Sequence, residues 1–115
     1  MSEYSGFFEL IGELSAIRGT SGDESAVREF IRSRIPKGCT VTEDSIGNLL
    51  VFAKGKKTPG SRIMYCAHMD EVGFIVTDIT GDGLLKFAPV GGISPAVVFG
   101  RRLVSRSGIT GVVAA

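Results

Sequence analysis

The sequence lacks a long apolar run, an excess of charge of either sign, and an N-terminal secretory pattern. No apolar run approaches the ~18 residues of a membrane span, so the sequence predicts no membrane segment. The 115 residues carry 13 basic and 12 acidic side chains, and this net charge of +1 argues against binding to nucleic acid or to anionic lipid. Met1-Ser-Glu-Tyr-Ser5 lacks the basic start and apolar core of a secretory signal, and we therefore expect a cytoplasmic protein.

Cysteine and histidine are scarce as well. Cys39 and Cys66 are too few for a disulfide scaffold, and their spacing matches no zinc knuckle, so we expect reduced, packed thiols. The sequence contains no Gly-x-Ser-x-Gly element, and neither cysteine has a second histidine with which to pair, so nucleophilic catalysis has no support. The segment 19–22 lacks the Gly-Lys-Ser/Thr ending of a phosphate-binding loop.

Glycine is abundant, at 16 of 115 residues, and it is dispersed between apolar segments. This distribution predicts turns in a β-rich chain rather than a flexible linker. The final stretch, 109–115, is apolar and typical of a strand, and no polar tail or cap follows it. We therefore expect the chain to be part of a longer protein.

The first 35 residues predict two helices. Apolar residues recur at three- and four-residue spacing over 5–17, which is typical of an amphipathic helix. A connection at 19–22 ends it, and a second helix with an apolar face should then end before Pro36. Ser21 and Glu24 have the spacing of a capping box at the start of that second helix.

The rest of the chain predicts strands separated by turns. The expected strands are 40–43, 49–53, 63–68, 72–79, 84–90, 97–99, 103–105 and 109–114. Because 63–68 is almost continuously apolar, it should be covered on both faces, and helices packed on such a sheet imply an α/β layer. The strands after it have no helix between them, which is typical of a barrel or sandwich. We therefore expect a domain boundary near Asp70, between residues 1–70 and residues 71–115.

The single histidine, His68, closes the predicted strand 63–68, and Met69, Asp70 and Glu71 follow it. Ligands bind at the carboxyl ends of strands in open α/β sheets. In an extended chain His68 and Asp70 point to the same side, and a carboxylate beside an imidazole can fix its tautomer and strengthen it as a metal ligand. The spacing alone also fits a hydrogen-bonded histidine without a catalytic role.

The surrounding residues add a resemblance to a known family. The segment Ala67-His-Met-Asp-Glu-Val-Gly-Phe74 resembles the metal-site segment of the dinuclear aminopeptidases that assemble as tetrahedral dodecamers. That family includes glutamyl, leucyl and lysyl aminopeptidases and proteins labelled endoglucanase. Weaker similarities follow in the same order along the chain, at 19–28, 44–49, 82–87 and 90–92.

The resemblance implies a fold and a site. It implies an incomplete phosphorylase/hydrolase-like catalytic layer of two helices plus sheet over 1–70, and the start of an inserted PDZ-like β-barrel dimerisation domain over 71–115. It implies that His68 is a metal ligand and that Asp70 is the catalytic carboxylate that orients it, while Glu71 receives no role. Two divalent ions, zinc or cobalt, a peptide substrate and a dodecamer-type homo-oligomer are implied for the complete enzyme.

Other interpretations of the same residues stay open. A two-metal hydrolase needs further ligands and a base, yet only Asp78 and Asp82 follow Glu71 as acids, so the chain by itself should be inactive. The alternative is a non-catalytic module in which the β-rich residues from 72 onward mediate self-association. A polysaccharide hydrolase would need paired carboxylates, and none is visible beyond Asp70 and Glu71.

Overall fold

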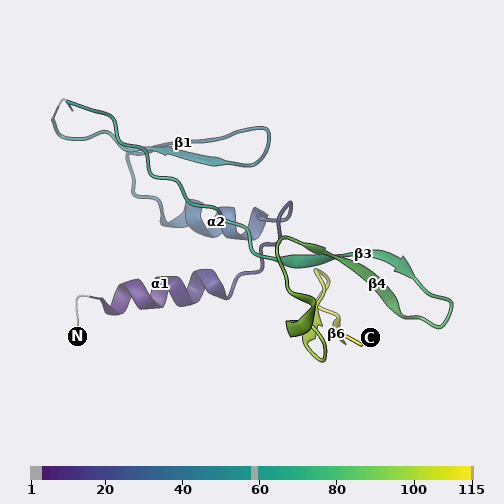
Figure 1. Cartoon of the computed structure of the whole chain (residues 1–115). Coiled ribbons are helices and arrows are strands. Elements are labelled where there is room, and N and C mark those ends of the chain that lie inside the picture. The colour runs from purple at the N-terminus through teal and green to yellow at the C-terminus, as the bar shows by residue number, and fades with distance from the viewer. Residues whose placement is uncertain (1–3, 58–59, 115) are drawn as a thin grey trace. The chain divides into compact units, whose positions relative to one another are not determined.

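The structure is a computed structural model that describes residues 4–57 and 60–114 (Figure 1). The chain divides into two compact units, Met1–Glu71 and Val72–Ala115. Within residues 4–57 and 60–114, two α-helices, one short 3-10 helix and three two-stranded sheets make up the regular structure, which agrees with the α/β class expected from the sequence. No helix in the described part of the chain is both long enough and apolar enough to cross a membrane.

Unit 1 begins with the two predicted helices. Helix α1 spans Ser5–Ser15 and helix α2 spans Ser25–Arg34. The residue after α2, Ile35, is extended, because a residue that precedes a proline disfavours the helical conformation. Val27 of α2 is 6% exposed and is the one apolar side chain that counts as buried in the described residues. The apolar stripe of α1, by contrast, is open to solvent at Phe7, Phe8 and Ile11.

A hairpin follows, as predicted. Strand β1, Thr40–Glu43, pairs antiparallel with strand β2, Leu49–Phe52. The turn between them is held by the Asp44 carboxylate, which accepts hydrogen bonds from the backbone N–H of Ile46 at 3.1 Å, from that of Asn48 at 2.9 Å and from the Asn48 side chain at 2.8 Å. The bond from the Asn48 side chain is the main cause that lowers the pKa of Asp44.

The predicted strand at 63–68 is not formed. The segment belongs to none of the strands assigned in residues 4–57 and 60–114, and it runs as an unpaired trace between β2 and β3 (Figure 1). Its side chains are exposed, with Ile63 at 74%, Met64 at 84% and Tyr65 at 91%. A strand needs a neighbour that takes up its backbone hydrogen bonds, and the described residues place none beside it. Cys66 is consequently exposed, although Cys39 is partly covered and both are free thiols.

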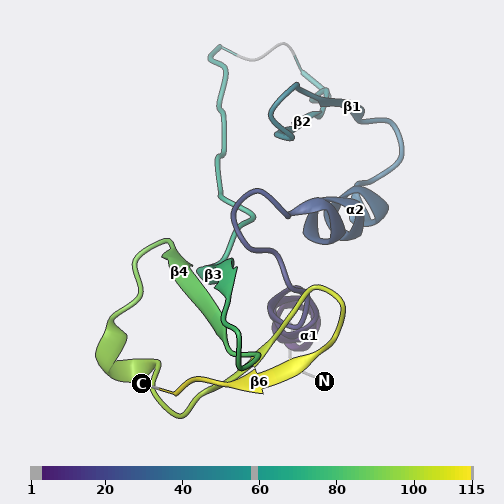
Figure 2. The same ribbon diagram turned by 90° about the vertical axis from the view of Figure 1, so that its right-hand side faces the viewer.

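Unit 2 contains two antiparallel hairpins (Figure 2). Strand β3, Gly73–Ile79, pairs with β4, Leu85–Val90, with a register shift between Val76 and Asp78. The rings of Phe74 and Phe87 meet edge to face with centroids 4.9 Å apart. Strand β5, Arg102–Val104, pairs with β6, Thr110–Val112. The PDZ-like barrel expected for this part of the chain stays a prediction.

One strand predicted in unit 2 is wrong. The sequence predicts a strand at 97–99, but the chain forms a 3-10 helix, η1, over Pro95–Val97. Proline at the first position fixes a helical φ and needs no N–H partner there, so it favours this turn over a strand.

Candidate functional site

His68 and Asp70 face each other, as their spacing predicts. The Nδ1 atom of His68 lies 2.9 Å from the backbone carbonyl oxygen of Asp70 and 3.1 Å from Oδ1 of its carboxylate. Two acceptors at Nδ1 favour the neutral tautomer that carries its proton on Nδ1, and in that tautomer the Nε2 lone pair is available. The His68 side chain is 85% exposed, so that lone pair can reach a ligand.

The second oxygen of the Asp70 carboxylate is bonded to a residue far away in the sequence. The Ser21 hydroxyl donates a hydrogen bond to Oδ2 of Asp70. This bond is the largest cause that lowers the pKa of Asp70, and the neighbouring His68 ring also lowers it. As a carboxylate, Asp70 can accept a hydrogen bond from the imidazole with one oxygen and from the Ser21 hydroxyl with the other.

This contact corrects the capping box predicted from Ser21 and Glu24. Helix α2 has no side-chain hydrogen bond at its N-cap, which is Glu24 itself. The Glu24 carboxylate instead accepts a bond of 2.6 Å from the backbone N–H of Gly22. Ser21 bonds Asp70 in preference to the helix because the loop before α2 runs beside the segment that carries His68.

Backbone hydrogen bonds fix that loop in place. The N–H of Glu71 donates to the carbonyl oxygen of Gly19 at 2.7 Å, and the N–H of Gly19 donates to the Glu71 carboxylate at 3.1 Å. Thr20 and Glu71 form a single parallel bridge. Glu71, which the sequence left without a role, thus uses its side chain to bind the loop.

Gly19 sits where a larger residue would not fit. It is buried, and a Cβ atom added to it would lie 2.6 Å from Cγ2 of Val27 and 3.5 Å from the carbonyl oxygen of Met69. The loop can therefore approach α2 and the His68 segment closely because this position has no side chain.

We predict that Gly19→Ala lowers the free energy of unfolding by about 1–3 kcal/mol, because the new methyl group overpacks against Val27. Urea unfolding followed by circular dichroism measures the change. Gly60→Ala is the matched control, since Gly60 lies outside the helices and strands and nothing lies within 4 Å of the position a Cβ would take there. Equal unfolding midpoints for the two variants would contradict the packing described here.

A small cavity adjoins His68. Its volume is about 150 Å³, and it is lined by Glu24, Ile46, Gly47, Asn48, Ala67, His68, Met69 and Asp70. The turn of the β1–β2 hairpin therefore forms one wall of the space beside the imidazole. This cavity gives the exposed histidine a concave, polar surrounding on unit 1.

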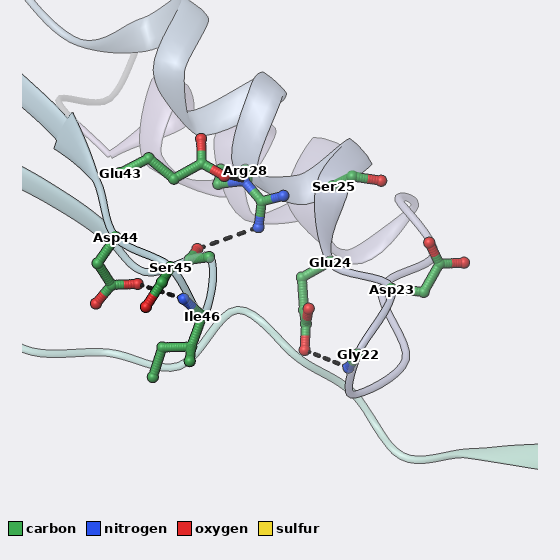
Figure 3. Close-up of a pocket in the computed structure, with 10 residues that line it drawn as sticks. Gly22, Asp23, Glu24, Ser25, Arg28, Glu43, Asp44, Ser45 and Ile46 are labelled. Carbon is green, nitrogen blue, oxygen red and sulfur yellow. Dashed lines mark hydrogen bonds and ion pairs between the residues drawn. The ribbon is translucent and has the colours of Figure 1, made fainter.

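A second cavity, of about 320 Å³, lies between α2 and the same turn (Figure 3). Arg28 lines it, and its guanidinium forms an ion pair with the Glu43 carboxylate at 2.9 Å and donates a hydrogen bond to the carbonyl oxygen of Gly47 at 3.1 Å. The Arg28 side chain is only 16% exposed. The ion pair and the bond to the carbonyl hold the turn, and so the wall beside His68, against α2.

A metal ion fits this site in part. An imidazole whose Nδ1 is bonded to a carboxylate and whose Nε2 is free is the usual arrangement of a metal-binding histidine. However, no group of three or more His, Cys, Asp or Glu side chains in the described part of the chain could together hold an ion. The described residues thus bring together one imidazole, that of His68, and one carboxylate, that of Asp70, in a geometry that a metal-binding histidine could use.

Comparison with known proteins places the chain in a family. The family model of the M42 glutamyl aminopeptidases matches residues 47–115, which is more than half of the chain and includes His68, Asp70 and all of unit 2. The chain belongs to the M42 family. The resemblance to the tetrahedral aminopeptidases is thereby confirmed.

Individual M42 relatives are similar over most of the chain. The glutamyl aminopeptidase of Lactococcus lactis subsp. cremoris is 39% identical over 104 residues, which cover 88% of this chain and 29% of that protein. Among solved structures, the Pyrococcus horikoshii TET1 peptidase has a TM-score of 0.77 at 38% identity. The match covers 94% of this chain and 33% of the TET1 chain. The TET1 peptidase can assemble into a tetrahedron or a large octahedral shell. The aminopeptidase APDkam598 of Desulfurococcus kamchatkensis has a TM-score of 0.82 at 31% identity, over 95% and 31% of the two chains.

The M42 chain described here spans about a third of the length of the curated relatives it matches. The two-residue spacing of His68 and Asp70, together with the resemblance of the segment 67–74, singled out this pair, and the structure brings the two side chains together. Sequence reasoning missed the part played by Ser21, since the local pattern around that serine indicates a helix cap.

Proposed function

We propose that this chain is the N-terminal portion of a metal-dependent aminopeptidase that removes N-terminal residues from peptides. The observation that supports it is the geometry of the sole histidine, His68, in a chain of the M42 family. Its Nδ1 is engaged by Asp70 and its Nε2 is open. A cytoplasmic location stays a prediction from the sequence.

Each residue of the pair has a distinct proposed role. His68 is one metal ligand and binds through Nε2. Asp70 accepts a hydrogen bond from Nδ1–H, holds the tautomer that keeps Nε2 free, and adds negative charge that strengthens the imidazole as a ligand. The Ser21 bond lowers the pKa of Asp70, which favours the carboxylate form that this role uses.

Two divalent ions, zinc or cobalt, would supply the activation of a water molecule and the polarisation of the scissile carbonyl when bound. The described residues bring one ligand to such a pair, and we propose that the others come from the part of the family that this chain does not span. The cavity beside His68 would then face the reacting peptide.

Unit 2 has a proposed role of its own. Its hairpins expose large apolar side chains, among them Ile75, Val76, Ile79, Leu85 and Val112. Apolar patches of this kind are typical of contacts between subunits. We propose that residues 71–115 begin a PDZ-like β-barrel domain through which copies assemble into a dodecamer-type homo-oligomer, as the tetrahedral assembly of the TET1 relative suggests.

A chimera tests the proposed activity. Residues 1–115 are joined to the portion of the Lactococcus lactis glutamyl aminopeptidase that this chain does not cover. We predict that this chimera hydrolyses glutamyl- or leucyl-anilides, that a chelator abolishes the activity, and that zinc or cobalt restores it. The uncovered portion of the relative expressed alone is the control and should be inactive, because it lacks a counterpart of His68.

The same experiment separates the alternative function. A chimera that assembles into the oligomer of its relative but shows no metal-dependent hydrolysis would contradict the proposed role in catalysis. It would favour the non-catalytic interpretation, in which the β-rich residues from 72 onward serve self-association alone.

A further inference from the structure

Two stretches of unit 1 that are about fifty residues apart in sequence are held in a fixed register. The backbone bond from Glu71 to Gly19 at 2.7 Å, and the return bond from Gly19 to the Glu71 carboxylate at 3.1 Å, join them at one point. Buried Gly19, packed against Val27, anchors the loop on α2. The residue two positions after Gly19 therefore has a defined position beside the residue before Glu71.

Those two residues are Ser21 and Asp70. The Ser21 hydroxyl donates to Oδ2 of Asp70, while Oδ1 of the same carboxylate lies 3.1 Å from Nδ1 of His68. Each carboxylate oxygen thus has a different partner. The three side chains lie in series from the Ser21 hydroxyl through the Asp70 carboxylate to the imidazole, whose Nδ1 also lies 2.9 Å from the backbone carbonyl oxygen of Asp70.

We infer that Ser21 is a positioning residue, which orients the Asp70 carboxylate and through it the metal-binding His68. This inference rests on the proposed function. It assigns to the loop before α2 a part in the metal site. The loop acts through its hydrogen bond to the Asp70 carboxylate.

Exposure explains why such a residue is needed. The Asp70 side chain is 39% exposed and that of His68 is 85% exposed, so neither is locked by packing. An exposed carboxylate without a second partner rotates and exchanges its hydrogen bonds with water. The Gly19–Glu71 hydrogen bonds fix the position of the Ser21 hydroxyl. This hydroxyl restricts rotation of the Asp70 carboxylate and keeps its Oδ1 atom directed at Nδ1 of His68.

The chain contains a single histidine, so its ring nitrogens can be read without ambiguity by ¹⁵N NMR. The metal-free 115-residue chain is measured at about pH 8, where histidine side chains are ordinarily neutral. We expect the Nδ1–H tautomer to dominate in the natural sequence, to lose population in Ser21→Ala, and to be retained in Ser21→Thr, which keeps the hydroxyl. Ser25→Ala, an exposed serine on α2, is the control and should change nothing.

A zinc titration follows the Nε2 signal of the same samples, so that zinc bound by the cysteines is not counted. Ser21→Ala should raise the zinc concentration at half-change by about ten-fold, the lower end of the effect of removing an outer partner of a metal ligand. In an Asp70→Ala background the Ser21→Ala change should have no further effect, because Ser21 acts through that carboxylate.

The outcomes separate the two proposals. If Ser21→Ala keeps the tautomer ratio and the zinc midpoint of the natural sequence, or if its effect persists in the Asp70→Ala background, the positioning role is overturned. If zinc leaves the Nε2 signal of the natural sequence unchanged while Ser21→Ala still shifts the tautomer, Ser21 orients the pair and the metal function is what fails. Circular dichroism confirms that each variant keeps its helices, and Ser21→Thr gives a second test should Ser21→Ala not fold.

Discussion

Replacing His68 by alanine in the chimera is expected to lower peptidase activity by at least about a hundred-fold, because the change removes the proposed metal ligand. Removing an outer partner of a ligand typically costs only 10–100-fold. Metal content after dialysis should fall with it. The measurement pairs anilide hydrolysis with metal analysis of the same preparation. A control at the second cavity's exposed Ser45, Ser45→Ala, should leave both quantities unchanged.

Asp70→Asn separates the role of the ligand from that of the residue that orients it. The amide keeps the shape of the side chain but removes the charge that His68 Nδ1 faces at 3.1 Å. We expect turnover at saturating metal to fall by about 10–100-fold, with a smaller loss of bound metal than in His68→Ala. Activity equal to that of the unaltered chimera would show that Asp70 does not assist the histidine.

The second large effect concerns the 115-residue chain by itself. We expect it to show no hydrolysis of leucyl- or glutamyl-anilides above background, even with excess zinc or cobalt. Its described residues contain no group of three or more potential metal ligands, and a two-metal site must hold its ions about 3.5–4 Å apart between several ligands.

Purity decides this measurement, because a trace of a host aminopeptidase would imitate activity. The His68→Ala chain, purified in parallel, is therefore the control. Hydrolysis that is present in the natural sequence and absent from this variant would contradict the expectation, and would mean that one histidine and its neighbouring acids suffice.

The sequence determined the local elements of this chain. Three- and four-residue apolar spacing predicts α1, Pro36 sets the end of α2, and the turn at 44–48 fixes the β1–β2 hairpin. Each of these signals acts between residues a few positions apart, so it can be seen without a fold. The two-residue spacing of His68 and Asp70 is of the same kind, and the structure brings that pair into contact.

Only the tertiary structure decided which distant groups meet. The bond from Ser21 to Asp70 joins residues 49 positions apart, and a local capping signal at Ser21 pointed elsewhere. Glu71 received its place from the backbone of Gly19. The apolar run at 63–68 has the composition of a covered strand, yet a strand forms only where a neighbour accepts its hydrogen bonds, and within the described residues none lies beside it. Pairing and long-range hydrogen bonding depend on which segments come together in space, and that information is not contained in any short stretch of sequence.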